Sequence, residues 1–287
     1  MPLRILVIDG NPREGREQHR QAYGRDSSEG YALLLRQLDP TVDCTIVTPA
    51  DEGSSLPQGD DLSGYDGAVL TGSQLHMEEM SPPIIRQLDL MRAVFKAGVP
   101  AFGSCWGVQV AGTVAGGEVK RNPNGPEYGF ARRLSPTAEG SGHPLLEGRP
   151  GAYDAPAIHL DAVVTPPPDA RILASNGVLA LQATEIRHEG GVFWGVQYHP
   201  EHNLHELAVM LESFAHELVE EKLVANEDAV KTYAADLKAL HAAPDRTDLA
   251  WRFGIDAEVI DPARRTREVR NFLTHLVRPT KSARGRT

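Results

Sequence analysis

The sequence predicts an α/β fold, in which an open, mainly parallel sheet is flanked by helices and followed by a helical C-terminal extension. Short apolar runs alternate with helical patterns from residue 3 to residue 115, which is typical of parallel strands joined by helices. From residue 118 to residue 198 the apolar runs are short and broken by proline and glycine, which indicates an antiparallel extension of the sheet. With 287 residues, of which 41% are hydrophobic, the chain can build one large core and an appendage.

The first elements follow from the apolar pattern. We expect strands at residues 3–8, 44–47 and 67–70, and a helix at residues 28–38 that is capped by Ser27 or Ser28. Residues 82–97 carry apolar side chains at helical spacing and stop at Gly98, as a helix does. A strand at residues 99–102 and a helix at residues 106–115 complete the alternating part.

The second half closes one domain and adds another segment. A strand is expected at residues 191–198 and a closing helix at residues 204–218, so the main domain covers residues 1–217. Residues 218–287 form the extension, with helices expected around residues 228–242 and 265–277. We expect this extension to be helical cover, or a surface for dimerisation or a partner, rather than a second active site.

Cys105 stands where an expected strand turns sharply into an expected helix. Residues 101–112 read AFGSCWGVQVAG, with Gly103 and Gly107 two positions on either side of the cysteine. Glycines there let strand and helix approach closely and let the turn adopt a strained conformation, as in a nucleophile elbow. A helix N-terminus also favours a thiolate. Cys105 is therefore a candidate nucleophile, although a small cysteine buried in an apolar turn has the same pattern.

A histidine and a carboxylate follow a second apolar run. Residues 191–198 read GVFWGVQY, and His199, Pro200 and Glu201 come directly after them. Open α/β sheets bind ligands at the carboxyl ends of their strands. Pro200 restricts His199 to an extended backbone, and Glu201 is near enough in sequence to orient the imidazole. A thiolate that attacks an acyl carbon needs such a base and carboxylate, so the sequence predicts a triad of Cys105, His199 and Glu201.

With these segments the chain resembles the class I, triad-type glutamine amidotransferases over roughly residues 1–217. The resemblance implies a flavodoxin-like fold and an oxyanion hole formed by the backbone N–H groups of Gly72 and Trp106. It also implies a set of substrate-binding residues: Gln109 of the Cys-x-Gly-x-Gln motif, Glu127 and Tyr128, and His159, Leu160 and Asp161. Two departures stand out, since Gly72 is followed by Ser73 instead of a proline and Leu160 replaces the family's serine.

The resemblance implies a hydrolase that cleaves the γ-amide of glutamine, or of a γ-glutamyl compound, through a γ-glutamyl thioester. The segments are most similar to the glutaminase half of GMP synthetase, and such a domain could pass ammonia to a separate synthetase partner. No P-loop and no pyrophosphatase loop occurs in the sequence, so ATP-dependent amination needs that partner. A free-standing hydrolase of γ-glutamyl peptides or amides is the close alternative, and a non-catalytic regulatory subunit is a third.

Composition limits partners and compartment. The formal net charge of −10 argues against general nucleic-acid binding, and no apolar stretch approaches the length of a membrane span. With two cysteines and no leader segment we expect a cytoplasmic protein, where a thiolate stays reduced. The tail is basic and is expected to be a solvated, frayed end; its cations are Arg278, Lys281, Arg284 and Arg286.

Two further hypotheses concern residues outside the triad. Residues 10–27 are long, polar and arginine-rich and leave the carboxyl end of the first strand, so they are expected to form either a loop that recognises the acceptor or the γ-substituent, or a mobile surface loop. The spacing of His188, His199, His202 and His205 could serve a metal, but no second ligand cluster completes such a site. We therefore expect no metal and no cofactor.

Overall fold

The computed structural model describes the chain except for residues 1, 57, 58, 60, 286 and 287. Within these residues one large sheet runs in the order β2-β1-β3-β4-β11-β10-β9-β6-β7, and a two-stranded sheet pairs β5 with β8. The neighbours from β2 to β11 are parallel and the rest of the large sheet is antiparallel. The strands are β1 (Arg4–Ile8), β2 (Asp43–Val47), β3 (Gly67–Leu70), β4 (Ala101–Ser104), β5 (Glu118–Arg121), β6 (Glu127–Pro136), β7 (Tyr153–His159), β8 (Asp161–Thr165), β9 (Ala170–Ser175), β10 (Ala183–His188) and β11 (Gly191–Val196). The expected fold class is confirmed.

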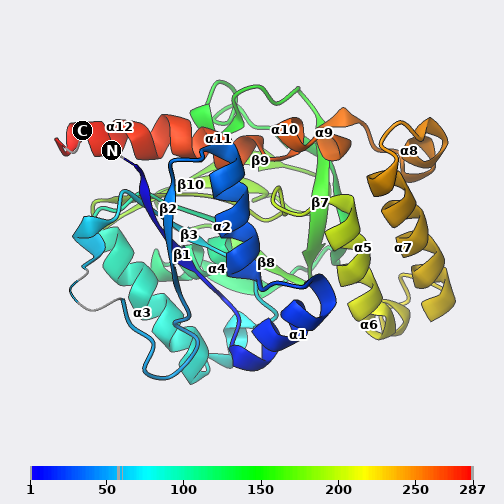
Figure 1. The fold of residues 1–287 in the computed structure, drawn as a ribbon, viewed down its shortest axis with the longest axis horizontal. Coiled ribbons are helices and arrows are strands. Elements are labelled where there is room, and N and C mark those ends of the chain that lie inside the picture. Colours follow the sequence, from blue (N-terminus) through cyan, green and yellow to red (C-terminus); the bar gives the residue numbers. More distant parts are fainter. Residues whose placement is uncertain (1, 57–58, 60, 286–287) are drawn as a thin grey trace.

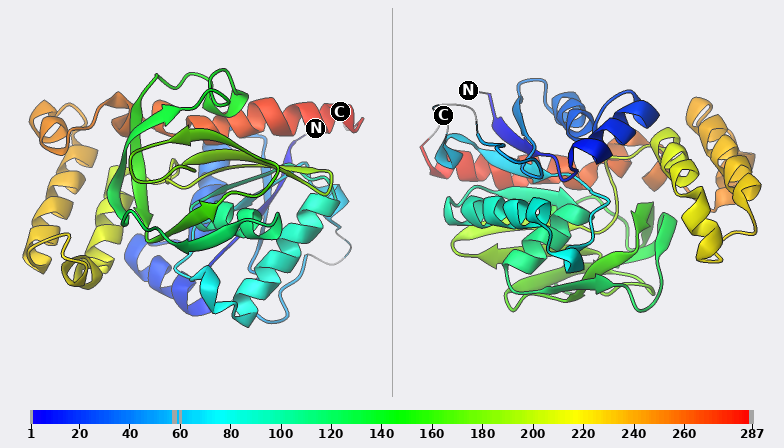
Figure 2. Two further views of the ribbon diagram at one scale, coloured as in Figure 1. Left: turned by 180° about the vertical axis from the view of Figure 1, so that it is seen from behind. Right: turned by 90° about the horizontal axis from the view of Figure 1, so that it is seen from below.

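Helices cover both faces of this sheet (Figures 1 and 2). The main helices are α1 (Arg13–Tyr23), α2 (Ser27–Leu38), α3 (Pro82–Lys96), α4 (Trp106–Val114), α5 (Leu204–Ser213), α6 (Ala215–Glu220), α7 (Glu227–Ala242) and α8 (Thr247–Phe253). Shorter turns follow at α9 (Ala257–Ile260), α10 (Pro262–Arg265), α11 (Arg267–Asn271), the π-helical η4 (Phe272–Val277) and α12 (Arg278–Ala283). The expected helices at residues 82–97, 106–115 and 228–242 are confirmed.

Three local expectations were wrong. Residues 10–27 are not a loop, because α1 occupies most of them and ends at Gly24 in the left-handed conformation with φ 75°. The cap of α2 is Asp26, whose side chain accepts from the Glu29 N–H in a capping box, not Ser27 or Ser28. The closing helix is interrupted at Phe214, where α5 ends and α6 begins.

The end of the chain packs on the sheet instead of fraying. Val269, Phe272 and Val277 lie in the same buried cluster as Ile5 of β1 and Phe102 of β4. Figure 1 shows these helices crossing the molecule near the start of β1. One face of the sheet is thus covered by α2 and the C-terminal helices, and the other by α3 and α4.

The basic tail is held by hydrogen bonds and ion pairs, which corrects the expectation of a solvated end. The Lys281 Nζ lies 3.1 Å from Asp66 and donates to the Pro2 carbonyl at 2.7 Å. Arg284 donates to the Ala97 carbonyl at 3.2 Å, and Arg278 pairs with Asp39. Arg286, the last cation of the predicted tail, lies outside the described residues.

A smaller cluster lies beside the sheet, where α5 packs against α7 and α7 packs against α8. Leu207, Leu211 and Leu237 are buried in it, while Trp251 of α8 is 86% exposed. No helix among the described residues is both long enough and apolar enough to cross a lipid bilayer.

Candidate active site

The Cys105 thiol sits on a strained turn between β4 and α4. Its backbone has φ 51° and ψ −104°, a conformation that costs a non-glycine residue on the order of 1–3 kcal/mol. A Cβ at Gly103 would lie 2.8 Å from the Gly107 Cα, and one at Gly107 would lie 2.7 Å from the Leu70 carbonyl oxygen. These glycines therefore allow the close approach of strand and helix that the sequence predicted.

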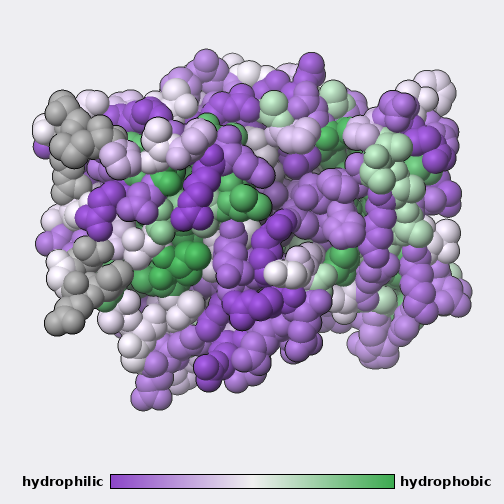
Figure 3. Space-filling model, in the orientation of Figure 1, coloured by the Kyte–Doolittle hydropathy of each residue, from purple (hydrophilic) through white to green (hydrophobic). Residues whose placement is uncertain are grey.

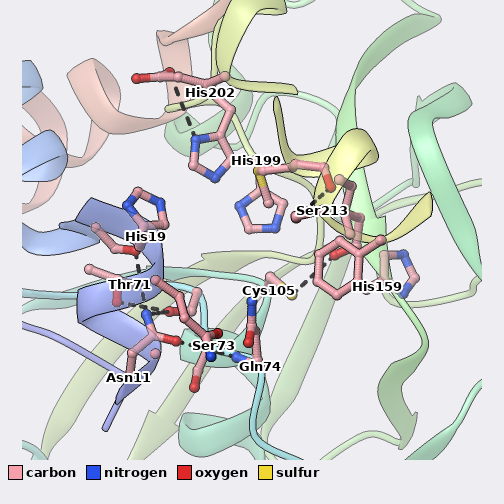
Figure 4. Close-up of a pocket in the computed structure, with 18 of the residues that line it drawn as sticks. Asn11, His19, Thr71, Ser73, Gln74, Cys105, His159, His199, His202 and Ser213 are labelled. Atoms are coloured by element: carbon pink, nitrogen blue, oxygen red, sulfur yellow. Dashed lines mark hydrogen bonds and ion pairs between the residues drawn. The ribbon is translucent and has the colours of Figure 1, made fainter. Parts of the chain in front are cut away.

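His199 and Glu201 meet this turn from the end of β11. The His199 Nδ1 lies 2.7 Å from the Glu201 Oε1. The backbone N–H of His199 donates to the Pro156 carbonyl at 2.7 Å. The Ser104 hydroxyl donates to the same Glu201 oxygen at 2.7 Å, and the Tyr31 hydroxyl donates to Oε2 at 3.5 Å. Figure 4 shows the imidazole of His199 above the thiol. The carboxylate is thus fixed from two sides while it holds the imidazole.

The electrostatics of the pair favour a charged imidazole. Burial alone would lower the pKa of His199, but the Glu201 carboxylate and the neighbouring Cys105 thiol outweigh it and raise the pKa to about 10. Burial likewise would raise the pKa of Glu201, and the His199 charge more than offsets this, so the pKa is lowered. At neutral pH the two groups form a buried imidazolium–carboxylate pair.

Gly72 lies beside the imidazole, in the turn after β3. Its carbonyl accepts from the Asn11 side-chain amide at 3.2 Å, and a Cβ at Gly72 would lie only 3.0 Å from the His199 Cε1. Trp106 opens α4, and its indole N–H donates away from the thiol to Gln87 at 2.8 Å. Of the two residues proposed for the oxyanion hole, Gly72 therefore lines the same cavity as Cys105, and Trp106 directly follows Cys105 as the first residue of α4.

The residues expected to bind substrate gather at one end of the site. The Gln109 amide donates to the Asp161 carbonyl at 2.9 Å, and the Asp161 carboxylate lies 2.7 Å from the His76 Nδ1. The His159 Nε2 lies 2.9 Å from the Glu127 Oε2. All but one of the expected set line the cavity, namely Gln109, Tyr128, His159, Leu160 and Asp161. The exception is Glu127, which lies behind His159 and holds it.

The thiol opens into a cavity of about 500 Å³, a size typical of small-molecule sites. His19 and Tyr23 of α1 form one wall, and Met210 of α5 with Phe214 and Glu217 of the α5–α6 corner forms another. Residues 10–27 were expected to form a loop, and in the structure helix α1 of this segment lines the same cavity as Cys105.

The model of the family "glutamine amidotransferase class-I" matches residues 29–218. The chain belongs to this family. It is 35% identical over 285 residues to a γ-glutamyl-L-1-hydroxyisopropylamide hydrolase of a Pseudomonas species, covering 97% of this chain and 94% of that protein. It is 37% identical over 173 residues to a GMP synthase of Leifsonia xyli, covering 59% of this chain but 31% of that protein.

Solved amidotransferases share the fold. One from Thermotoga maritima superposes with a TM-score of 0.65 at 18% identity, covering 96% of this chain and 99% of that one. One from Methylobacillus flagellatus has a TM-score of 0.62 at 18% identity, covering 95% and 94%. Membership of this family makes the chain an enzyme that hydrolyses the γ-amide bond of glutamine or of a γ-glutamyl compound.

The four histidines considered as metal ligands do not come together in this amidotransferase. His188 packs on Phe95 and His205 on His241, both away from the thiol. His202 stacks on His199 with ring centroids 4.7 Å apart, and with Glu201 these rings offer three ligand atoms within 4.8 Å of one another. Two of the three groups already hold each other as the predicted base and carboxylate.

Sequence reasoning missed the residues that hold Glu201 and the Gly72 turn in place. Tyr31 of α2 and Ser104 of β4 share a hydrogen bond of 2.9 Å and both reach Glu201. Asn11 holds the Gly72 turn and carries no family motif. Ser104 stands next to the nucleophile in sequence, which was the one available signal; nothing local marks Tyr31 or Asn11.

Proposed function

We propose that this amidotransferase is a free-standing γ-glutamyl amide hydrolase with Cys105 as nucleophile, His199 as acid and base, and Glu201 as the carboxylate that orients His199. One observation carries the proposal. The Cys105 thiol lies on a strained turn beside the His199 imidazole, and the Nδ1 of this imidazole is held by the Glu201 carboxylate. That carboxylate in turn accepts from the hydroxyl groups of Ser104 and Tyr31. This is the arrangement that nucleophilic acyl transfer requires.

In the first half-reaction the Cys105 thiolate attacks the γ-carbonyl carbon of the substrate. The backbone N–H groups of Gly72 and Trp106 bind the oxyanion, the latter at the start of α4, where the helix dipole favours negative charge. His199, which is protonated at neutral pH because Glu201 stabilises its charge, gives its proton to the leaving nitrogen. The C–N bond breaks, the amine departs, and a γ-glutamyl thioester remains on Cys105.

In the second half-reaction water replaces the amine. The now neutral His199 takes a proton from the water, whose oxygen attacks the thioester carbonyl, and the sulfur leaves as thiolate. Glutamate is released and the imidazolium–thiolate pair is restored. Gln109, Tyr128 and the segment His159 to Asp161, with Glu127 behind His159, would hold the glutamyl part during both steps.

Two observations favour a hydrolase that acts alone. The match to the Pseudomonas hydrolase covers 97% of this chain and 94% of that protein, whereas the match to the GMP synthase covers 59% of this chain and 31% of that protein. The cavity also continues beyond the thiol to α1, α5 and α6, which leaves room for an amine substituent larger than ammonia.

A second candidate is a glutaminase that passes ammonia to a separate synthetase. The similarity to GMP synthases over residues of the main domain favours it. The third alternative, a non-catalytic regulatory subunit, gives no reason for the hydrogen-bonded arrangement of His199 and Glu201 beside the Cys105 turn.

The test is hydrolysis by the purified chain of glutamine and of a panel of γ-glutamyl alkylamides and dipeptides, comparing wild type with Cys105→Ala. Cys44→Ala is the matched control, because Cys44 is the other cysteine and lies on β2 outside the cavity. Cysteine-dependent release of amine from the amides, faster than release of ammonia from glutamine, supports the proposal. Turnover of glutamine alone, and only with an added synthetase, supports the second candidate.

We further propose that residues 1–217 are the catalytic domain and residues 218–287 an extension that covers it. The family match ends at residue 218, and the last helices bury apolar side chains against β1 and β4. If copies or partners associate through the extension, the exposed Trp251 on α8 is the place where we expect the contact.

A further inference from the structure

Helix α1 is a cavity wall that precedes the part of the chain matched by the family model. The match begins at residue 29, and α1 ends at Tyr23. None of its residues is buried, and its outer surface is hydrophilic (Figure 3). Two ion pairs hold it, Arg16 with Asp51 at 2.6 Å and Arg20 with Asp26 at 2.7 Å. Its contribution to the site is therefore in what it presents to the cavity.

His19 presents a hydrogen-bond acceptor there. Its Nδ1 lies 2.8 Å from the Arg25 carbonyl oxygen, and because a carbonyl can only accept, Nδ1 carries the proton. Burial lowers the pKa of His19, so the ring is neutral at neutral pH and Nε2 keeps a lone pair. The ring stacks on Tyr23 with centroids 4.0 Å apart, which fixes its orientation.

The position of His19 is on the leaving-group side of the thiol. Figure 4 shows His19 on one side of His199, and His159 and Ser213 on the other. The expected glutamyl site includes His159, so the glutamyl part lies on that second side. The leaving nitrogen must face His199 to receive its proton, and its substituent then extends toward His19 and Tyr23.

The charges of the lining disfavour a carboxylate in this space. Arg25 is the sole lysine or arginine that lines the cavity within the described residues, and its Nη2 is paired with Glu206 at 2.7 Å. Glu217 also lines the cavity and offers no cation, and its Oε2 is buried without a hydrogen-bond partner within the described part of the chain. An anionic substituent would lose its hydration without gaining a cation.

We propose that α1 and α5 form a leaving-amine subsite for an uncharged, hydroxyl-bearing alkylamine. The hydroxyl donates to the His19 Nε2, the alkyl part packs between Tyr23 and Met210, and amines that carry a carboxylate, such as amino acids, are rejected. This rests on the proposed γ-glutamyl amide hydrolysis. The Pseudomonas relative is itself named for a hydroxyl-bearing alkylamide. What the structure adds for this chain is the assignment of the hydroxyl contact to His19 and of the alkyl contact to Tyr23 and Met210.

Three substrates with one carbon skeleton test the subsite: the γ-glutamyl amides of isopropylamine, alaninol and alanine. They differ only in a methyl, hydroxymethyl or carboxylate group. We expect kcat/KM to be about 3- to 10-fold higher for the alaninol amide than for the isopropylamide, the range of one neutral hydrogen bond. We expect the alanine amide to be at least about 10-fold slower than the isopropylamide, given the cost of desolvating its charge.

Variants assign the hydroxyl preference to His19. His19→Leu is expected to reduce the ratio of the alaninol to the isopropylamide kcat/KM to about 1, and His19→Gln, which retains an acceptor, to keep part of the ratio. His205→Leu is the matched control, because this histidine of α5 packs on His241 and does not line the cavity. Circular dichroism of each variant verifies the fold.

The outcomes separate the two proposals. If wild type turns over none of the three amides, the proposed function fails. If it turns over the alanine amide as fast as the alaninol amide, or if His19→Leu keeps the wild-type ratio, amide hydrolysis stands and the subsite is wrong.

Discussion

The floor and the wall of the cavity are built in opposite ways. The floor consists of Cys105, His199 and Glu201. Cys105 is 7% exposed, His199 is 4% exposed, and the side chain of Glu201 is 8% exposed. They are anchored by β4, β11 and α2. On the wall, α1 has no buried residue and is held mainly by ion pairs at its surface. Packing fixes the first region, and a few polar contacts fix the second.

This difference predicts that changes in α1 alter substrate preference while the chemistry at Cys105 is kept. Moving Cys105, His199 or Glu201 would disturb strands that cross the core, where even small volume changes are costly. Changing α1 alters few buried contacts. The following predictions test this division from the largest expected effect to the smallest.

Cys105→Ala is expected to lower kcat/KM by about 10⁴-fold or more, since no other group can form the thioester. The midpoint of denaturation should stay near that of wild type, because alanine fits the same turn. Steady-state kinetics with a γ-glutamyl amide and a urea titration measure the two effects. Cys44→Ala should retain wild-type kcat/KM; a loss as large as that of Cys105→Ala would contradict the assignment.

Glu201→Gln is expected to lower kcat by about 10²- to 10⁴-fold and to move the alkaline limb of the pH–rate profile to lower pH. In wild type the pKa of His199 is raised to about 10, so its protonated form stabilises the fold below the unfolded pKa of 6.5, and this contribution disappears as pH rises through about 10. The variant loses the carboxylate that raises the pKa. Glu212→Gln, which removes a charge paired with Lys238, should leave the profile in place. An unshifted limb in Glu201→Gln would disprove this role.

Gly107→Ala on the floor is expected to destabilise the fold by about 1–3 kcal/mol, because the new Cβ would lie 2.7 Å from the Leu70 carbonyl oxygen. Gly30→Ala, on the cavity side of α2, is the comparison. A Cβ at Gly30 would lie no nearer than 3.6 Å to any other atom, so this substitution in a helix interior should stabilise the fold by up to about 1 kcal/mol. Urea unfolding of both variants measures the contrast, and equal effects would mean that the elbow is not tightly packed.

Ser104→Ala is expected to lower kcat by about 10-fold with little change in KM, because it removes one of two hydroxyl contacts to Glu201 while Tyr31 remains. Tyr31→Phe should have a smaller effect, as its hydroxyl lies 3.5 Å from the carboxylate. Initial rates over a range of amide concentrations separate kcat from KM. An effect on KM alone would place Ser104 outside the orientation of the triad.

Arg16→Met on the wall is expected to raise KM for amides by about 3-fold and to change the unfolding free energy by less than about 1 kcal/mol, because it removes the tie between α1 and Asp51. Hydrogen exchange should become faster in α1 and stay unchanged in β4. Arg13→Met, which affects an exposed pair with Glu17, should change neither quantity. Faster exchange in β4 would show that wall and floor are coupled.

The sequence was informative wherever burial imposes a pattern. The strands expected at residues 3–8 and 67–70 are largely apolar runs because both faces of the sheet are covered there, whereas β2, at the edge of the sheet, buries only Val47. The glycines around Cys105 were recognisable because backbone contact excludes any side chain there. His199 and Glu201 stood out because they directly follow such a strand.

The misses share a physical cause, since they depend on contacts between distant segments. Helix α1 is polar except for Ala22 and Tyr23 at its end, so apolar periodicity did not reveal it. The C-terminal cations were expected to fray, yet Lys281 reaches Asp66, a partner 215 positions earlier. Tyr31 meets Glu201 across 170 positions. No local pattern encodes such pairings.

The central claim is that a γ-glutamyl group passes through Cys105. Rapid acid quenching of the enzyme during turnover of a γ-glutamyl amide, followed by mass spectrometry of its peptides, tests this most directly. We predict a mass increase of one γ-glutamyl group on the peptide that contains Cys105 and none on the peptide that contains Cys44. Rapid turnover by Cys105→Ala, or a γ-glutamyl group found on Cys44 instead, would contradict the mechanism.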